Sequence, residues 1–342
     1  MKSKNLRTLL GIVISLAFIY LALRTVDFAK LWDLFQQGTY WLLIPALLLI
    51  VLISWVRGYR WRLLLGAPRE LSLYRLYNFV NIGYLFNNVL PAKAGELARA
   101  YLAGRAIPGG VGQGLSSILL ERLLDVFCAV ILLVCLIPVV ELPGWIGTSG
   151  LILGIVVVVG TAVLVVLSLY GRRGVDWLWR LVERLPFTSH PKIAPFMLKL
   201  KDFVQNLVDG FGVLIKGKQL PGILLSSAAV WGGYWLLDYI FMGILNMTDL
   251  PLVSPALVLC ATGLSMVIPS SPGAVGPFEW AAAQALFVFA VDNNQAYGYA
   301  YGLHIFTNLV LIALGAVGLV AEGVSWTTIK RGAEKKTEQK NI

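Results

Sequence analysis

Charged residues, histidines and paired cysteines are scarce in this chain. Only 13% of its 342 residues are charged and 58% are hydrophobic, whereas a soluble domain has about 25% charged and about 45–50% apolar residues. This composition excludes an ordinary water-soluble protein. It predicts an all-α polytopic membrane protein.

Motifs for metals, nucleotides and hydrolytic chemistry are also missing. The three cysteines lie in apolar runs without CxxC spacing, and the two histidines, His190 and His304, are far apart in the sequence. GxxxxGK[ST], HExxH and GxSxG do not occur. We therefore expect no cofactor, no metal site, no catalytic residue and no enzymatic activity, and we interpret His304 as a hydrogen-bonded contact between helices.

Long apolar runs predict the spans, because a helix needs about 20 largely apolar residues to cross a bilayer. About six full spans are expected, at 8–26, 40–57, 115–139, 149–170, 221–245 and 298–322. Two further apolar stretches are interrupted: 72–90 ends at Pro91, and 255–290 is broken by IPSSPGAVGP. We expect both to form re-entrant helical hairpins, whose polar backbone groups must face protein or a watery cavity.

The positions of the basic residues predict the topology. With a cytoplasmic N-terminus, all 28 basic residues except Arg24, Lys30 and Arg122 fall in segments predicted to be cytoplasmic, and the outer loops near 141–148, 246–254 and 291–297 have none. This pattern indicates an inner-membrane protein with both termini in the cytoplasm. The net charge of +10 favours anionic lipids as partners, with no nucleic acid.

The elements in chain order form two halves of opposite topology. We expect one membrane domain over 1–342, with a first repeat at about 8–140 and a second at about 149–322. The segment 172–218, which interleaves aromatic and basic residues, is interpreted as helices at the membrane surface or as a solvated connector. A polar tail covers 326–342.

The two hairpins share a local pattern, VLPAKAGELARAYL and VIPSSPGAVGPFEWAAAQAL. Each has a Pro followed four residues later by a Gly, and each then opens a helix with Glu-x-Ala-x-Ala. Pro ends one half-helix and Gly permits the reversal. The residues expected at the hairpin turns are Pro91, Gly95, Pro269, Pro272, Gly273 and Gly276.

Ionisable residues inside a membrane are costly, so they mark candidate sites. The candidates for a headgroup cavity are Glu96, Arg99, Glu121, Arg122, Asp125, Glu279, Asn87 and Asn88, with Asp238 a weaker one. Arg99 is expected to pair with Glu96 one turn earlier, and Glu121 and Asp125 to share a helix face. Arg99 and Arg122 suit a lipid phosphate, aided by backbone N–H groups beside Gly95 and Gly276. The alternative is that the charges only hold broken helices together.

Four motifs in this order carry a resemblance over about residues 8–325. They are RWRLLL (60–65), NNVLPAKAGELARAYL (87–102), SILLERLLDV (117–126) and PSSPGAVGPFEWA (269–281). Together they resemble the flippase-like membrane domain of lysylphosphatidylglycerol synthases. The resemblance implies lipid translocation, with roles for the motif residues among the candidates above. Because the sequence ends about twenty residues after its last predicted helix, the resemblance does not extend to the soluble aminoacyl-transferase domain of those synthases.

We therefore expect a lipid flippase or lipid transporter that moves a phosphate-bearing phospholipid or prenyl-linked lipid between leaflets. An intramembrane lipid-modifying transferase, or its subunit, is one alternative. A membrane assembly partner without transport is another. A homo-oligomer and a lipid-synthesis enzyme are the further partners considered.

Overall fold

The computed structural model describes residues 27–90, 93–141, 171–184, 217–266 and 271–324, together with isolated positions between 155 and 208. The predicted spans 8–26 and, apart from single positions, 149–170 lie outside these residues, as do most of 172–218 and the tail 326–342. Within the described part, all regular structure is helical. The helices are α2 (Phe28–Gln36), η1 (Tyr40–Leu42), α3 (Leu43–Leu65), α4 (Leu73–Val89), α5 (Ala94–Gly104), α6 (Gly110–Leu136), α8 (Arg172–Val182), α10 (Leu220–Ile244), α11 (Ser254–Ser265), η2 (Pro272–Ala274), α12 (Pro277–Phe287) and α13 (Asn293–Ala321).

Three helices in the described part are long and apolar enough to cross a membrane: Tyr40–Leu65, Leu220–Ile244 and Asn293–Ala321. The last two confirm the helices predicted at 221–245 and 298–322. The prediction of an outer loop at 291–297 is wrong for most of these residues, because α13 already begins at Asn293. Asp292 caps it, accepting from the backbone N–H groups of Asn294 and Gln295 at 2.9 and 3.2 Å.

The predicted end of the second span at residue 57 is also wrong. Helix α3 continues to Leu65 and stops where Gly66 adopts a left-handed conformation, with φ of 59°. Arg57 and Arg60 therefore lie inside the helix, buried in protein rather than in a loop. The span predicted at 115–139 overlaps helix α6. The 27 residues of α6 extend about 40 Å at about 1.5 Å per residue.

Both interrupted stretches form pairs of short helices, as expected. Helices α4 and α5 pack against each other across the break near Pro91, and α11 packs against α12 across the break near Pro269; both prolines lie outside the described residues. In the second turn Pro272 begins η2, and Gly273 and Gly276 take φ values of 73° and 100° that favour glycine.

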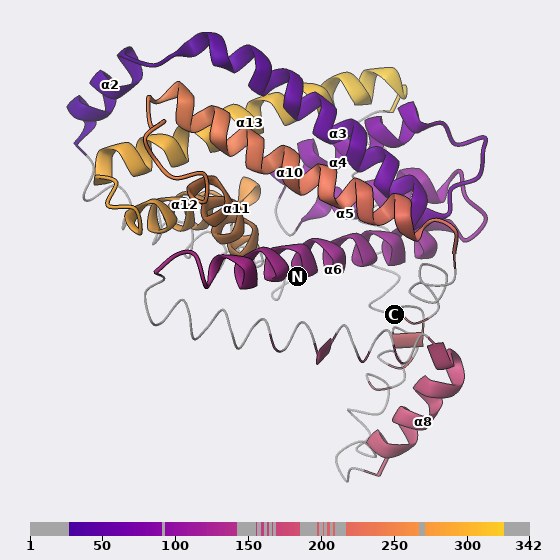
Figure 1. Ribbon diagram of the computed structural model, residues 1–342. Coiled ribbons are helices and arrows are strands. Elements are labelled where there is room, and N and C mark those ends of the chain that lie inside the picture. Colours follow the sequence, from indigo (N-terminus) through magenta and orange to yellow (C-terminus); the bar gives the residue numbers. More distant parts are fainter. Residues whose placement is uncertain are drawn as a thin grey trace, which may run out of the picture.

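The two pairs are embedded among the long helices (Figure 1). Helix α3 packs along α10, and α4 packs along α13, where a Cβ on Gly315 would lie 2.5 Å from the carbonyl oxygen of Asn81. One buried apolar cluster surrounds α11, α12 and α13, and a second joins α4 and α5 to the end of α3. Each hairpin pair thus packs against several of the long helices.

Helix α2 was not predicted from the sequence. Asp27 caps it by accepting from the N–H groups of Ala29 and Lys30. Trp32 and Trp41, in α2 and η1, are 66% and 67% exposed. Exposed tryptophans beside an apolar span are typical of the membrane–water interface.

Helix α8 is the described helix of the segment 172–218, and it stands apart from the bundle in Figure 1. Trp177 is exposed and Trp179 is buried, and Lys201 forms an ion pair with Asp176 at 3.0 Å. The location of this segment at the membrane surface stays a prediction.

Candidate functional site

Glu121, in the middle of α6, is the centre of a buried charge cluster. Its Oε1 accepts hydrogen bonds from Nη2 of Arg57 at 2.9 Å and of Arg60 at 3.4 Å, and its Oε2 accepts from Nη2 of Arg99 at 2.8 Å. The carboxylate is fully buried. Two arginines from α3 and one from α5 therefore converge on one acid of α6.

Asp125 extends the cluster by one helical turn. It accepts from Arg60 at 2.8 Å and from Arg57 at 3.1 Å, so Glu121 and Asp125 do share one helix face, as their spacing predicts. Helix α10 joins the cluster through Tyr234, whose hydroxyl accepts from Nη1 of Arg57 at 3.1 Å.

Arg122 and Glu96 form the accessible edge of the cluster. Nε of Arg122 lies 2.9 Å from Oε1 of Glu96, and its Nη1 lies 3.6 Å from Asp125. The side chains of Arg122 and Glu96 are 35% and 24% exposed. The pairing expected between Glu96 and Arg99 is wrong, because each of them finds its partner on α6 instead of on its own helix.

The environment of Arg99 leaves it little freedom. Its guanidinium lies over the ring of Trp61 at 4.2 Å, and Trp61 in turn donates to Ser117 at 3.0 Å. A Cβ on Gly83 would come within 2.5 Å of the Arg99 side chain, so α4 closes over it. Arg99 is thus enclosed by helices on several sides.

The cluster contains more arginines than carboxylates. Four arginines (Arg57, Arg60, Arg99 and Arg122) face three carboxylates (Glu96, Glu121 and Asp125). Arginine does not lose its proton in proteins. With three ionised carboxylates, the cluster therefore has a formal net charge of +1. No group of three or more His, Cys, Asp or Glu that could hold a metal lies in the described ranges.

The N–H groups expected to bind an anion are already engaged. The backbone N–H of Gly95 donates to Oδ1 of Asn87 at 2.8 Å, and that of Gly276 donates to Oε2 of Glu279 at 2.7 Å. Each half-helix is therefore capped by a side chain of this chain. That part of the predicted anion site is wrong.

The two hairpins touch each other near their turns. Asn88 donates to the carbonyl of Tyr84 at 3.0 Å, and its Oδ1 packs against Gly273, where a Cβ would lie 3.0 Å away. Nζ of Lys93 donates to the carbonyl of Met266, at the end of α11, at 3.1 Å. A cation is favourable at that end of a helix.

A second polar site lies between α12 and α13. Nδ1 of His304 lies 2.7 Å from Oε1 of Glu279, and the imidazole stacks on Phe278 with ring centroids 4.1 Å apart. Glu279 and His304 line a cavity of about 340 Å³ together with Asn308 and Tyr301. The helix contact predicted for His304 is confirmed. Its partner, Glu279, was a candidate site residue, but it is not part of the charge cluster.

Asp238 does not join either site among the described contacts. It is buried in α10, and its backbone carbonyl accepts from the hydroxyl of Tyr299 at 3.3 Å. In α4, Asn78 donates to Glu322 at 2.9 Å, and Asn81 donates within its own helix to the carbonyl of Tyr77 at 3.0 Å. These polar groups therefore contribute to helix packing.

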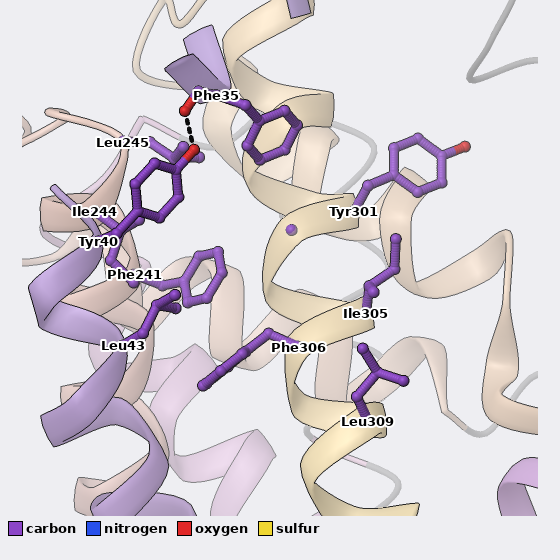
Figure 2. Close-up of a pocket in the computed structure, with 11 residues that line it drawn as sticks. Phe35, Tyr40, Leu43, Phe241, Ile244, Leu245, Tyr301, Ile305, Phe306 and Leu309 are labelled. Carbon is purple, nitrogen blue, oxygen red and sulfur yellow. Dashed lines mark hydrogen bonds between the residues drawn. The ribbon is translucent and has the colours of Figure 1, made fainter. Parts of the chain in front are cut away.

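A larger cavity, of about 510 Å³, is apolar and separate from the charge cluster (Figure 2). Side chains of α2, α3, α10 and α13 line it, among them Phe35, Phe241, Ile305 and Phe306. Tyr40 lies at its rim, with its hydroxyl donating to the carbonyl of Phe35. Such a cavity suits a hydrocarbon chain and offers nothing to a charged headgroup.

Comparisons with known proteins agree with the membrane character of the chain. Residues 8–315 match the model of the family described as "Lysylphosphatidylglycerol synthase TM region". Two similar proteins, both named "UPF0104 membrane protein", come from Methanothermobacter thermautotrophicus (strain Delta H). One is 26% identical over 289 residues, 81% of this chain and 82% of its own length, and the other is 23% identical over 237 residues, 64% and 67%. No solved structure matches the chain.

Proposed function

The chain belongs to the family of the lysylphosphatidylglycerol synthase TM region, and we propose that it is a multi-pass transporter that moves a phosphate-bearing lipid between leaflets. It acts without catalysis, and the headgroup of the lipid passes along the charge cluster while its tails stay in the bilayer. Anionic or otherwise phosphate-bearing membrane lipids are its partners.

The observation that carries the proposal is the excess of arginine in the charge cluster. Removing charges from water costs several kcal/mol per ion unless partners compensate them. Here Arg57, Arg60 and Arg99 share only Glu121 and Asp125. Arg122 pairs with Glu96 and reaches Asp125 at a longer distance, so four arginines meet three carboxylates. A lipid phosphate supplies the missing negative charge.

Arg122 is the arginine best suited to meet that phosphate. Arg57, Arg60 and Arg99 are buried and bonded to acids of α6, whereas Arg122 remains 35% exposed. A guanidinium binds phosphate through paired N–H donors. Glu96 then acts as the ligand that Arg122 exchanges for the phosphate.

The position of the cluster supports passage through the membrane. Glu121 is the twelfth of 27 residues in α6, and Arg57 is the fifteenth of 23 in α3. If these helices cross the bilayer, the cluster lies near its midplane, where transporters built from inverted repeats bind their substrates beside broken helices. We interpret α4–α5 and α11–α12 as re-entrant hairpins that enter from opposite leaflets, with both chain termini in the cytoplasm of an inner membrane.

The test compares single and double variants of the Arg122–Glu96 pair. The purified full chain is reconstituted in phosphatidylcholine vesicles, and the movement of fluorescent phosphatidylglycerol between leaflets is followed by quenching with dithionite. A charge-assisted contact is worth about 1.5–3 kcal/mol, so Arg122→Gln is expected to slow movement by about 10- to 100-fold.

The double variant Glu96→Gln/Arg122→Gln separates recognition from structure. It leaves no unpaired carboxylate, so it restores movement if the pair only holds helices together, and it stays slow if Arg122 binds phosphate. Arg75→Gln is the matched control, because Arg75 is 46% exposed and also pairs with a glutamate, Glu322, at 3.0 Å. Normal movement in Arg122→Gln, recovery in the double variant, or equal movement of phosphate-free fluorescent glucosylceramide contradicts the proposal.

A further inference from the structure

The Glu279–His304 site differs chemically from the charge cluster. Oε2 of Glu279 accepts a hydrogen bond from the Gly276 N–H at 2.7 Å, and its Oε1 lies 2.7 Å from Nδ1 of His304. Because an ionised carboxylate can only accept, Nδ1 carries the hydrogen when Glu279 is a carboxylate. In neutral His304 the ring nitrogen that is free to gain a proton is therefore Nε2.

We propose that the Glu279–His304 pair binds one proton for each lipid moved, so that a proton gradient drives the movement. This inference rests on the proposed function and names its energy source. The proton adds to Nε2 of the neutral imidazole and gives an imidazolium beside the Glu279 carboxylate. It leaves again as the same proton on the opposite side of the membrane, so no other reactant is needed.

Burial and position support this assignment. The side chains of Glu279 and His304 are 2% and 5% exposed, yet they line a cavity that also contains the polar side chain of Asn308. His304 is the twelfth of 29 residues in α13, far from either helix end. Buried acid–histidine pairs within membrane helices are a recurring element of proton relays in pumps and transporters.

The acid of this pair lies at a helix terminus. Glu279 lies in the first turn of α12, where the partial positive charge of the helix favours a carboxylate. Phe278, beside it, holds the imidazole by stacking. The site can therefore change from a formal charge of −1 to 0 on gaining one proton, without rearranging its hydrogen bonds.

The helices packed against α12 and α13 carry the charged and titratable groups that surround the pair. Against α12, α11 carries Cys260 as its one titratable side chain. Against α13, such groups are Lys30 and Asp33 of α2, Tyr234, Asp238 and Tyr239 of α10, Tyr74, Arg75, Tyr77 and Tyr84 of α4, and Arg57, Tyr59, Arg60 and Arg62 of α3. Helix α13 adds three tyrosines, of which Tyr301 lines the same cavity. Within the described residues, His304 is the one side chain in this region whose charge ordinarily changes between about pH 5 and 8.

The test imposes a pH gradient on vesicles that contain the full chain. Trace fluorescent phosphatidylglycerol is added to phosphatidylcholine vesicles, and potassium with valinomycin holds the membrane potential at zero. Coupling of one proton to one lipid predicts that the ratio of the probe between leaflets changes about tenfold for each pH unit of the gradient. A protonophore should abolish this change.

His304→Gln is the informative variant, because its amide can still donate to Glu279 but cannot titrate. We expect a leaflet ratio that does not depend on the gradient, whereas Arg75→Gln keeps the full response. A wild-type ratio that ignores the gradient while the probe still moves overturns proton coupling alone. No movement of the probe in wild type under any gradient overturns the proposed function as well.

A second measurement addresses the site itself, whatever the transport result. The chain has two histidines, so nitrogen-15 histidine NMR of the His190→Gln variant reports on His304 alone. We expect its Nε2 signal to titrate while Nδ1 stays bonded to the carboxylate. A His304 ring that keeps one protonation state from about pH 5 to 8 overturns the proposal.

Discussion

Glu96 and Glu279 open the short helices α5 and α12 at matching positions of the two hairpin motifs, yet they meet different partners. Glu96 pairs with Arg122 at the accessible edge of the charge cluster. Glu279 caps its own helix at Gly276 and pairs with buried His304. The same acid at the same place thus meets a guanidinium in one hairpin and an imidazole in the other.

In the proposed mechanism, the two hairpins therefore have different tasks, the recognition of an anion and the binding of a proton. A fixed cation suits the recognition of an anion, because its charge does not depend on pH. An imidazole suits the uptake and release of protons. The two hairpins touch through Lys93 and Met266, and through Asn88 and Gly273.

The largest loss of stability is expected when one of the two buried acids, Glu121 or Glu279, is replaced by glutamine. Glu121→Gln leaves Arg57, Arg60 and Arg99 with too few negative partners, and an uncompensated buried charge costs about 3–5 kcal/mol. Glu279→Gln loses charge-assisted hydrogen bonds worth about 1.5–3 kcal/mol. Thermal unfolding in detergent should rank Glu121→Gln well below Glu279→Gln, and the reverse order contradicts the account of the charge cluster.

The glycines of the two hairpins should respond for different reasons. A Cβ on Gly95 would lie 1.8 Å from the carbonyl oxygen of Gly83, so Gly95→Ala should force α4 and α5 apart at a cost of about 1–3 kcal/mol or more. Gly276→Ala imposes the φ of 100° on an L-residue and costs about 1–3 kcal/mol as backbone strain.

Gly112 provides the control for both glycine variants. It lies in α6 with nothing within 4 Å of the position of its Cβ. Gly112→Ala should therefore stabilise the protein by up to about 1 kcal/mol through helix propensity. The same thermal unfolding series measures all three variants, and a stable Gly95→Ala protein would show that the first hairpin is packed less tightly than its geometry indicates.

The smallest effect is expected in the apolar cavity of Figure 2, whose lining residues include no charged side chain. Gly302 lines it, and a Cβ there would lie 3.0 Å from the ring of Phe241. Gly302→Leu fills space that would suit a hydrocarbon chain. It should slow lipid movement by less than about tenfold, since one buried CH₂ group is worth about 0.8 kcal/mol, or about fourfold in rate. Movement as slow as in Arg122→Gln would show that the apolar cavity limits lipid movement as strongly as headgroup recognition does.

Hydropathy and turn residues were sufficient to predict most of the helices. The long helices α10 and α13, and the breaks of both hairpins, were expected from apolar length and from Pro and Gly. The end of α3 was missed, because Arg57 and Arg60 interrupt the apolar run and resemble a loop in sequence. Helix α2 was missed because nine amphipathic residues give no span, although Asp27 is a typical N-cap.

The candidate residues were found more easily than their partners. Charges in apolar segments identified Glu121, Arg122 and Glu279, but the spacing of Glu96 and Arg99 suggested a pair within one helix. Tertiary packing brings α6 closer to both of them, and a sequence contains no direct record of that distance. The capping of Gly95 by Asn87 depends likewise on how α4 meets α5.

One measurement tests the division of tasks between the hairpins most directly. Arg122→Gln and His304→Gln are compared in the same vesicles, with the rate and the final leaflet ratio of fluorescent phosphatidylglycerol recorded with and without a pH gradient. We predict that Arg122→Gln approaches the wild-type ratio slowly, because coupling is intact and recognition is weakened, and that in His304→Gln the ratio no longer follows the gradient. If both variants lose rate and gradient response together, the two sites are one functional unit and the account is contradicted.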